Sequence, residues 1–191
     1  MADTPLYRGR VRFTENPQSL QSIYCFFLIF EYNKDRRGGA HMENVRNVAN
    51  WFLSQSSMTH KKVQKLCYYA QAWYCTLYDG TPLFEDEIQA WVHGPVIVSL
   101  YPIFADYRWS EIPKKEFDAS VLSNEAIEVL EAVYNTYGGF TGDQLESLTH
   151  SEEPWKVARG DLKPWETCST PISCSAMREY YARQYAQSQN D

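Results

Sequence analysis

The sequence of 191 residues contains no apolar segment long enough to cross a lipid bilayer. Its longest apolar run, Ile23–Phe30, has eight residues, whereas a membrane-spanning helix needs about 20. The run also makes a poor signal peptide, because the basic residues lie far upstream of it and no small-residue cleavage site follows. The sequence therefore does not favour a membrane protein.

Cysteine spacings typical of disulfide frameworks or metal sites are missing too. The five cysteines are an odd number and include no CxxC pair. Cys67 and Cys75 lie on one expected helix about 12 Å apart, which is too far for a disulfide bond. This usage predicts reduced cysteines in a cytoplasmic protein.

Basic residues are scarce. The chain has 18 basic and 24 acidic side chains and a net charge of −6, and its main basic cluster is Lys61, Lys62 and Lys65. Broad affinity for nucleic acid needs a larger basic surface. The charge therefore counts against a nucleic-acid partner and suits a soluble protein or a basic partner.

Sequence signatures of catalysis are absent as well. The chain has no glycine-rich phosphate loop and no GxSxG, HExxH or Walker pattern. The spacing of its histidines and carboxylates matches no standard metal site. We expect Cys67 to be inert because it lies on the core face of a helix. These absences predict no catalytic residue, no metal and no cofactor, and therefore a protein that is not an enzyme.

The most regular stretch of the chain is Thr59–Tyr78, which reads as a helix that is apolar on nearly every side. One face carries an apolar stripe at helical spacing, formed by Val63, Leu66, Cys67, Ala70, Tyr74 and Leu77. Such a helix is normally buried, so we expect the other elements to pack on it. Its polar residues gather at its start, which we expect to reach water: His60, Lys61, Lys62 and Lys65. Thr59 can cap the start, and Asp79-Gly80 can end the helix.

The remaining patterns predict a mainly α fold, a compact helical domain around this buried central helix. Helices are expected at residues 42–55, 123–138 and 173–187, with a capping-box start at Thr141. A short extended or β segment is expected near residues 83–93, where apolar residues alternate. Pro95 is then expected near the start of another helix, with Val96, Leu100, Ile103 and Tyr107 on one face.

Residues 1–41 differ in character from the rest. They carry six basic and four acidic side chains, against 12 and 20 in residues 42–191. The sequence Arg-Arg-Gly-Gly shortly before Met42 is what a purine-rich ribosome-binding site gives when translated. We therefore expect Met42 to be the true start, residues 1–41 to be a non-native or disordered extension, and residues 42–187 to form a single domain. The alternative is a genuine arm whose apolar run docks on that domain.

Two local sequences stand out, AWVHGPV (Ala90–Val96) and LTHSEEPW (Leu148–Trp155). Both can be purely structural, with a tight turn at Gly94-Pro95 and tryptophans that fill the core. In the functional interpretation they form an exposed recognition surface, in which Trp91 is the best candidate for a core role. The candidate partner-binding residues are Trp91, His93, Gly94, Pro95, Tyr101, His150 and Trp155. If they do not bind a partner, the start of the central helix, His60–Lys65, is the next candidate surface.

These motifs carry a family resemblance. VRNVANWFL, VQKLCYYAQAWY, LFEDEIQAWVHGPVIVSLY and LTHSEEPW occur in this order between about Met42 and about Tyr181. The segment resembles the Panacea domain of SocA-like antitoxins, including proteins labelled phage-associated. The resemblance implies a mainly helical domain that neutralises a toxin encoded beside it. It carries over no catalytic residue, because the family is not known for a shared catalytic site.

The sequence thus predicts a cytoplasmic antitoxin of a toxin–antitoxin system that binds its cognate toxin directly. One alternative is a hydrolase or transferase that uses His93, His150 and a nearby carboxylate. Another is a DNA-binding regulator that reads DNA through the short helices of residues 141–159, although the net charge counts against it. The sequence leaves the toxin, the route of neutralisation and the oligomeric state open.

Overall fold

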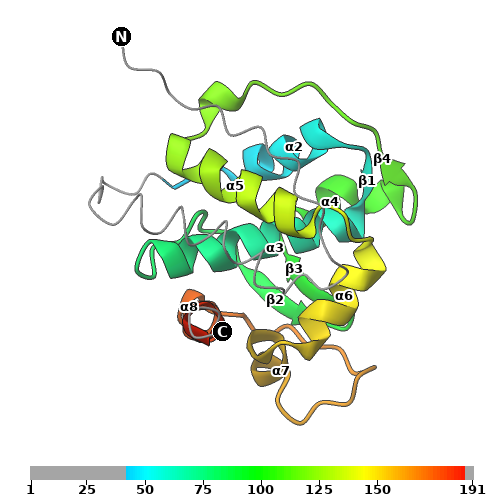
Figure 1. Ribbon diagram of the computed structural model, residues 1–191. Helices are drawn as coiled ribbons and strands as arrows, with labels where there is room; N and C mark the ends of the chain where they lie inside the picture. The colour runs from blue at the N-terminus through cyan, green and yellow to red at the C-terminus, as the bar shows by residue number, and fades with distance from the viewer. Residues whose placement is uncertain (1–41, 188–191) are drawn as a thin grey trace.

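The computed structural model describes residues 42–187, so the expectations for residues 1–41 lie outside the described part of the chain. This part is mainly helical with two small antiparallel sheets (Figure 1), which confirms the predicted fold class. None of its helices is both long and apolar enough to cross a membrane. The elements in chain order are α2 (Val45–Gln55), β1 (Met58–Thr59), α3 (His60–Leu77), β2 (Ile88–Trp91), β3 (Gly94–Ile97), α4 (Tyr101–Phe104), η1 (Ala105–Tyr107), β4 (Glu111–Ile112), η2 (Ala119–Val121), α5 (Asn124–Tyr137), α6 (Gly142–Ser151), α7 (Glu153–Arg159) and α8 (Cys174–Gln187).

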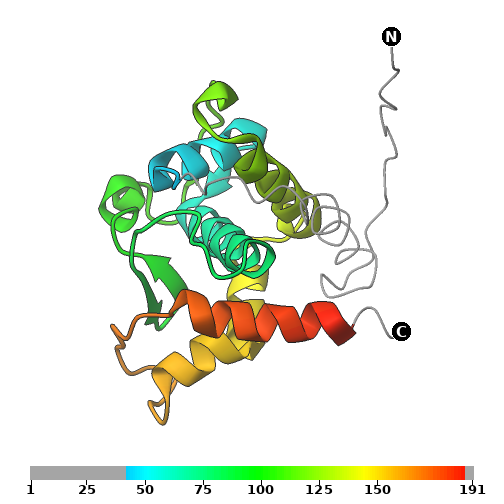
Figure 2. The same cartoon turned by 90° about the vertical axis from the view of Figure 1, so that its left-hand side faces the viewer.

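Helix α3 lies at the centre of the fold, as predicted. Helices α2 and α5 lie on one side of it and α6, α7 and α8 on the other (Figures 1 and 2). The Thr59 side chain caps its start by accepting a hydrogen bond from the Lys62 backbone N–H. Its end is followed by Asp79 and Gly80, both with positive φ, a conformation that stops a helix. Burial on all sides explains why its sequence is apolar nearly all round.

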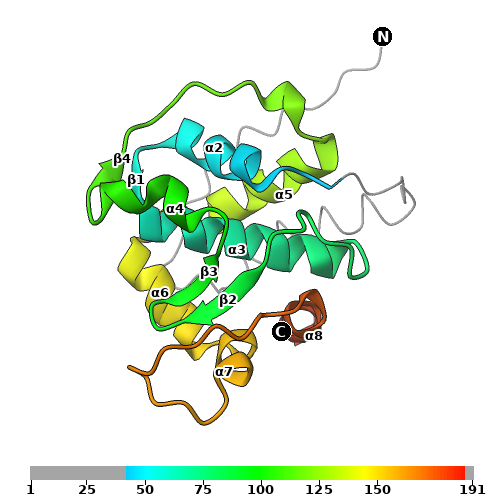
Figure 3. The same cartoon turned by 180° about the vertical axis from the view of Figure 1, so that it is seen from behind.

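The start of α3 is less exposed than predicted. His60 and Lys65 are only 7% and 1% exposed, and Lys61 and Lys62 are half-buried. The prediction that these residues reach water is therefore wrong for His60 and Lys65. The physical reason is that the β2–β3 hairpin and helix α6 fold back over this end of α3 (Figure 3).

The extended segment predicted near residues 83–93 contains strand β2, but the helix predicted from Pro95 does not form. Residues 94–97 instead make strand β3, antiparallel to β2, with Ala90 opposite Pro95 and Trp91 opposite Gly94. Gly94 has φ +89, which a glycine adopts without strain at the end of a tight turn. Helix α4 begins only at Tyr101. The sequence pattern could not show that residues 94–97 would find a partner strand.

Both edges of this hairpin are covered. At the outer edge of β3, the Ile97 N–H donates to Gln64 Oε1 over 2.7 Å, and Lys65 Nζ donates to the Pro95 carbonyl over 3.0 Å. At the outer edge of β2, the backbone pairs with residues 170–172. Side chains of α3 therefore satisfy the backbone groups at the edge of β3, as a neighbouring strand would. An exposed strand edge could otherwise pair with another chain.

Helix α8 packs along α3 and is joined to it covalently. Cys75 of α3 and Cys174 at the start of α8 form a disulfide, with their Cα atoms 5.9 Å apart. The prediction that the cysteines are reduced is therefore wrong for this pair. The two residues are too far apart in sequence for a local pattern to reveal the bond. Cys67 is buried, and burial raises the pKa of its thiol. This agrees with the predicted inert core role.

A buried carboxyl group also joins the helices around α3. Glu152, at the junction of α6 and α7, accepts hydrogen bonds from the hydroxyls of Tyr69 in α3 (3.3 Å) and Tyr181 in α8 (2.7 Å). Burial raises the pKa of Glu152 to about 8, although the two hydroxyls act in the opposite direction. The motif LTHSEEPW therefore contributes a core residue that fixes three helices together.

Candidate functional site

The two unusual motifs of the sequence lie against each other. The indole N–H of Trp155 donates to the Trp91 carbonyl over 3.0 Å, and Arg159 Nη1 donates to the Ala90 carbonyl over 3.0 Å. The Arg159 guanidinium also lies 4.9 Å from the centre of the Trp155 ring, close enough for a cation–π contact. Helix α7 therefore holds strand β2 in place from below (Figure 3).

His150, in the second motif, faces the interior of this contact. Its ring stacks on Trp155 with centroids 4.0 Å apart. Its Nε2 atom is buried and has no hydrogen-bond partner among the described residues. Burial lowers the pKa of His150, so the neutral ring is favoured. His150 is thus half-buried, with its ring packed on Trp155.

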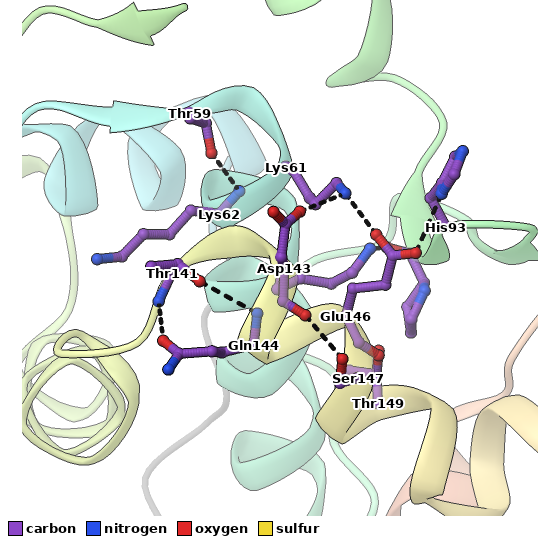
Figure 4. A network of polar contacts seen from close by, with 12 residues as sticks. Thr59, Lys61, Lys62, His93, Thr141, Asp143, Gln144, Glu146, Ser147 and Thr149 are labelled. Carbon is purple, nitrogen blue, oxygen red and sulfur yellow. Dashed lines mark hydrogen bonds and ion pairs between the residues drawn. The ribbon is translucent and has the colours of Figure 1, made fainter. Parts of the chain in front are cut away.

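His93 belongs to a polar network at the turn of the hairpin (Figure 4). Its Nδ1 lies 3.0 Å from Glu146 Oε1 of α6, and Lys61 Nζ of α3 lies 2.5 Å from Glu146 Oε2 and 2.8 Å from Asp143. Burial opposes the charge on Glu146, but hydrogen bonds from Lys61 and His93 lower its pKa overall. Glu146 therefore carries the negative charge that joins α3, α6 and the hairpin.

A cavity of about 670 Å³ opens beside this network. Three segments that are distant in sequence line it: the start of α3, the hairpin with the chain through Trp109, and residues 167–169. The two surfaces that the sequence suggested as alternatives, His60–Lys65 and the turn around His93, are thus walls of one cavity. Its volume falls within the range of about 300–1,000 Å³ that ligand pockets occupy.

The predicted partner-binding residues differ in their access to this cavity. The His93 side chain is 65% exposed, Tyr101 is 42% exposed and Trp91 is half-buried, and all three line the cavity. The Trp91 and Tyr101 rings lie 4.9 Å apart. The other candidates are buried or half-buried beneath them and hold them in place: Gly94, Pro95, Trp155 and His150. His93, Tyr101 and Trp91 are therefore the candidates that a partner in the cavity could contact.

Lys65 lines the cavity, and its side chain leaves no room for a residue larger than glycine at position 94. A Cβ atom on Gly94 would lie 2.7 Å from Lys65 Cε and 2.9 Å from Thr149 Oγ1. Both distances are shorter than real Cβ contacts, so Gly94 leaves the space that Lys65 fills. Burial lowers the pKa of Lys65 to about 7. Burial therefore favours the neutral form of this lysine more than exposure to water would.

Sequence reasoning missed several residues that line the cavity, among them Arg108 and Trp109. The structure places both of these side chains in the cavity wall. Trp109 is 76% exposed, and Lys61 Nζ lies 5.4 Å from the centre of its ring. A tryptophan in a polar loop was the one signal that could have drawn attention to this place.

The large exposed apolar side chains fall mainly in two segments of the chain. Apart from Met42 and Val121, the large exposed hydrophobic side chains of the described chain lie in residues 98–109 or 157–165: Val98, Tyr101, Ile103, Trp109, Val157, Leu162 and Trp165. The first of these segments lines the cavity and the second precedes residues 167–169. Of these side chains, Tyr101 and Trp109 line the cavity itself.

The geometry offers little for catalysis. Glu146 orients the His93 ring, but within residues 42–187 no hydroxyl or thiol is hydrogen-bonded to this histidine. The same residues contain no group of three or more His, Cys, Asp or Glu side chains that could hold a metal ion. The arrangement is suited to binding, with aromatic rings and cations held on a rigid frame.

Comparison with known families gives one result. Residues 63–156 match the family described as Antitoxin SocA-like, Panacea domain, which confirms the resemblance seen in the sequence motifs. The matched segment runs from the first turn of α3 into the first half of α7, so it contains the hairpin and most of the cavity wall. Searches of curated proteins and of solved structures gave no match.

Proposed function

We propose that this protein is an antitoxin that neutralises a cognate toxin by direct protein–protein binding. The binding surface would be the cavity face, which we define as residues 60–65, 91–109 and 167–169. The observation that supports it best is that two exposed aromatic side chains, Tyr101 and Trp109, line the cavity together with Trp91. The matched family is named for antitoxins, which supports a toxin as the partner. The toxin would be the product of an adjacent gene, met in the cytoplasm.

The rigidity of the hairpin supports this role. Gln64 and Lys65 bond to strand β3, and Trp155 and Arg159 bond to strand β2. These contacts hold the exposed rings of the turn in one arrangement before a partner arrives. A preorganised surface loses little conformational entropy on binding.

The chemistry of the exposed side chains fits an interface as well. Trp, Tyr and Arg are enriched among the residues whose truncation weakens protein complexes most. The cavity face presents all three types, as Trp91, Tyr101, Trp109 and Arg108. Neutralisation would follow from burial of a toxin surface against this face, without any chemical step.

The test begins with the partner. The tagged antitoxin is purified from its native cells, the bound protein is identified, and that protein is expressed with and without the antitoxin to measure growth. Tyr101→Ala and His93→Ala are then compared with wild type for rescue of growth and for melting temperature. We expect rescue to weaken while the melting temperature stays nearly unchanged, because truncated hot-spot residues cost about 2 kcal/mol or more of binding.

Val121→Ala is the matched control, because Val121 is exposed and apolar but lies outside the cavity face. It should leave both rescue and melting temperature as in wild type. Full rescue by stable Tyr101 and His93 variants would move the toxin-binding surface elsewhere. Failure of any co-purified protein to inhibit growth would argue against the antitoxin role itself.

A further inference from the structure

Arg108 has a backbone conformation that arginine seldom adopts. Its φ is 48° and its ψ is −109°, and the Ser110 N–H donates to the Tyr107 carbonyl over 2.8 Å across it. These values describe the first central position of a type II′ turn, where glycine is strongly preferred. Backbone strain of this kind persists where the surrounding structure enforces it, and it clusters at functional sites.

The strained turn places an uncompensated cation at the cavity. The Arg108 side chain lines the cavity and forms no ion pair with the residues that the structure describes. The other permanent cation of the wall, Lys61, is already bound by Asp143 and Glu146. No Asp or Glu is present among the described residues that line the cavity. A ligand carboxylate would thus find a free guanidinium without a competing acidic group in the wall.

Apolar rings flank this cation. Trp109 follows Arg108 directly, and Trp91 and Tyr101 form another part of the same wall. Val98 and Ile103, on either side of Tyr101 in the chain, are exposed apolar side chains outside the cavity lining. Exposed apolar side chains both inside and outside the cavity favour an occupant longer than a small molecule, such as a segment of polypeptide chain.

We propose that the cavity receives a short segment of the partner protein that carries an acidic side chain next to an apolar one. The carboxylate binds the Arg108 guanidinium, and the apolar side chain packs against Trp91, Tyr101 and Trp109. Arginine suits this role because its planar fork of donors binds a carboxylate through two hydrogen bonds. The inference rests on the proposed function in that the partner is the toxin, and it adds the chemistry by which the toxin is recognised.

Short peptides test this chemistry without the toxin. The protein is titrated with Ac-Gly-Phe-Glu-Gly-NH₂ and with the same peptide carrying Gln or Lys in place of Glu. Binding is followed by NMR at the Arg108 Nε and at the indole N–H groups of Trp91 and Trp109. We expect the Glu peptide to bind about tenfold more tightly than the Gln peptide, since hydrogen bonds to charged groups are the stronger ones.

Two variants supply the controls. Arg108→Gly removes the guanidinium while giving the turn its preferred residue, so the preference for Glu should disappear while the melting temperature stays the same or rises. Lys114→Gln removes an exposed cation outside the cavity and should keep the preference. A preference that survives in Arg108→Gly would show that another group binds the carboxylate and would overturn the assignment.

Other results would also overturn it. Equal binding of all three peptides would make the cavity purely apolar, and absence of shifts at Trp91 and Trp109 would remove the cavity as a peptide site. Shifts at Arg108 with inorganic phosphate but with none of the peptides would indicate a small-anion site instead. Since no toxin is present, these outcomes are independent of the growth test, and failure of the peptide chemistry can be told apart from failure of the antitoxin role.

Discussion

Two of the buried charged side chains, Lys65 of α3 and Glu152 beside α3, have different surroundings. Glu152 is enclosed by tyrosines from α3 and α8. It is not among the residues that line the cavity. Lys65, one turn before Tyr69 in α3, donates to the Pro95 carbonyl and borders the cavity. The enclosed acid belongs to the core, whereas the base lies where core and recognition surface meet.

The comparison shows how one helix serves two purposes. Toward its end, α3 packs aromatic rings, such as Tyr69 stacked on Tyr137 with centroids 4.0 Å apart. Toward its start, it uses Gln64 and Lys65 to hold the edge of the hairpin that carries the exposed rings. Changes near Tyr69 should therefore affect stability alone, and changes at the cavity should affect binding.

The largest effect is expected from Leu66→Ala, in the fully buried stripe of α3. Removing a buried leucine side chain in this way costs about 2–5 kcal/mol, through lost burial and the cavity left behind. The free energy of unfolding from chemical denaturation measures it. Because Leu66 lies between both regions, rescue from the toxin should fall together with stability. A loss under about 1 kcal/mol would mean that this face of α3 is not the core.

The next effect is expected from Gly94→Ala, at the contact between hairpin and Lys65. The added methyl group would displace the Lys65 side chain and Thr149, and alanine at φ +89 is strained. Strain of this kind costs about 1–3 kcal/mol. Denaturation measures the loss, and the double variant with Lys65→Ala is the control. If contact between the new methyl group and the Lys65 side chain causes part of the lost stability, Gly94→Ala should cost less in the Lys65→Ala background than in wild type. An equal cost in both backgrounds would leave backbone strain at φ as the sole cause.

The regular elements of this fold were predictable from local sequence. The Thr59 cap, the buried stripe of α3 and the start of α5 all depend on neighbours within a few positions. The capping box at Thr141 is present with both of its hydrogen bonds. Local rules suffice where the partners of a backbone group lie within one helical turn.

Features that depend on distant partners were not predictable. Lys65 reads as an exposed helix-start lysine, and only the Pro95 carbonyl 30 positions later explains its burial. The disulfide joins cysteines 99 positions apart. Residues of the motif AWVHGPV line the cavity, but the motifs did not indicate that Arg108 lines it too, because a strained φ is not visible in a sequence. Distance along the chain explains these failures, whereas the helix expected from Pro95 failed locally, because residues 94–97 pair with the neighbouring strand β2.

A smaller effect on stability is expected from the buried carboxyl group of Glu152. Burial raises the pKa of Glu152 to about 8, well above the value of about 4.3 for an exposed glutamate. The folded protein thus binds a proton that the unfolded chain releases, and stability should fall as pH rises from about 4.3 to 8. Glu152→Gln stays neutral, so this decline should be weaker and the variant should be relatively more stable above pH 8. Denaturation midpoints across this pH range measure it.

The control for this experiment comes from the basic side. The depressed pKa of Lys65, about 7, has the opposite effect: the unfolded chain holds the proton longer, and stability should rise between about pH 7 and 10.4. Lys65→Met should remove this rise without changing the decline at lower pH. Identical pH profiles for wild type and Glu152→Gln would show that the carboxyl is not buried in its neutral form.

The smallest effect is expected from Asp143→Asn, in the network that links Lys61 to α6. The Asp143 side chain is 87% exposed, and exposed ion pairs contribute under about 1 kcal/mol and weaken with salt.

Glu146 also binds Lys61 but is 17% exposed and holds His93 as well, so Glu146→Gln should be the more damaging change. It would release the histidine of the hairpin turn and weaken rescue from the toxin, which Asp143→Asn should leave intact. Unfolding at low and high salt, with the growth assay, measures both variants. Equal behaviour of the two would mean that the network stabilises α6 alone and does not position the recognition turn.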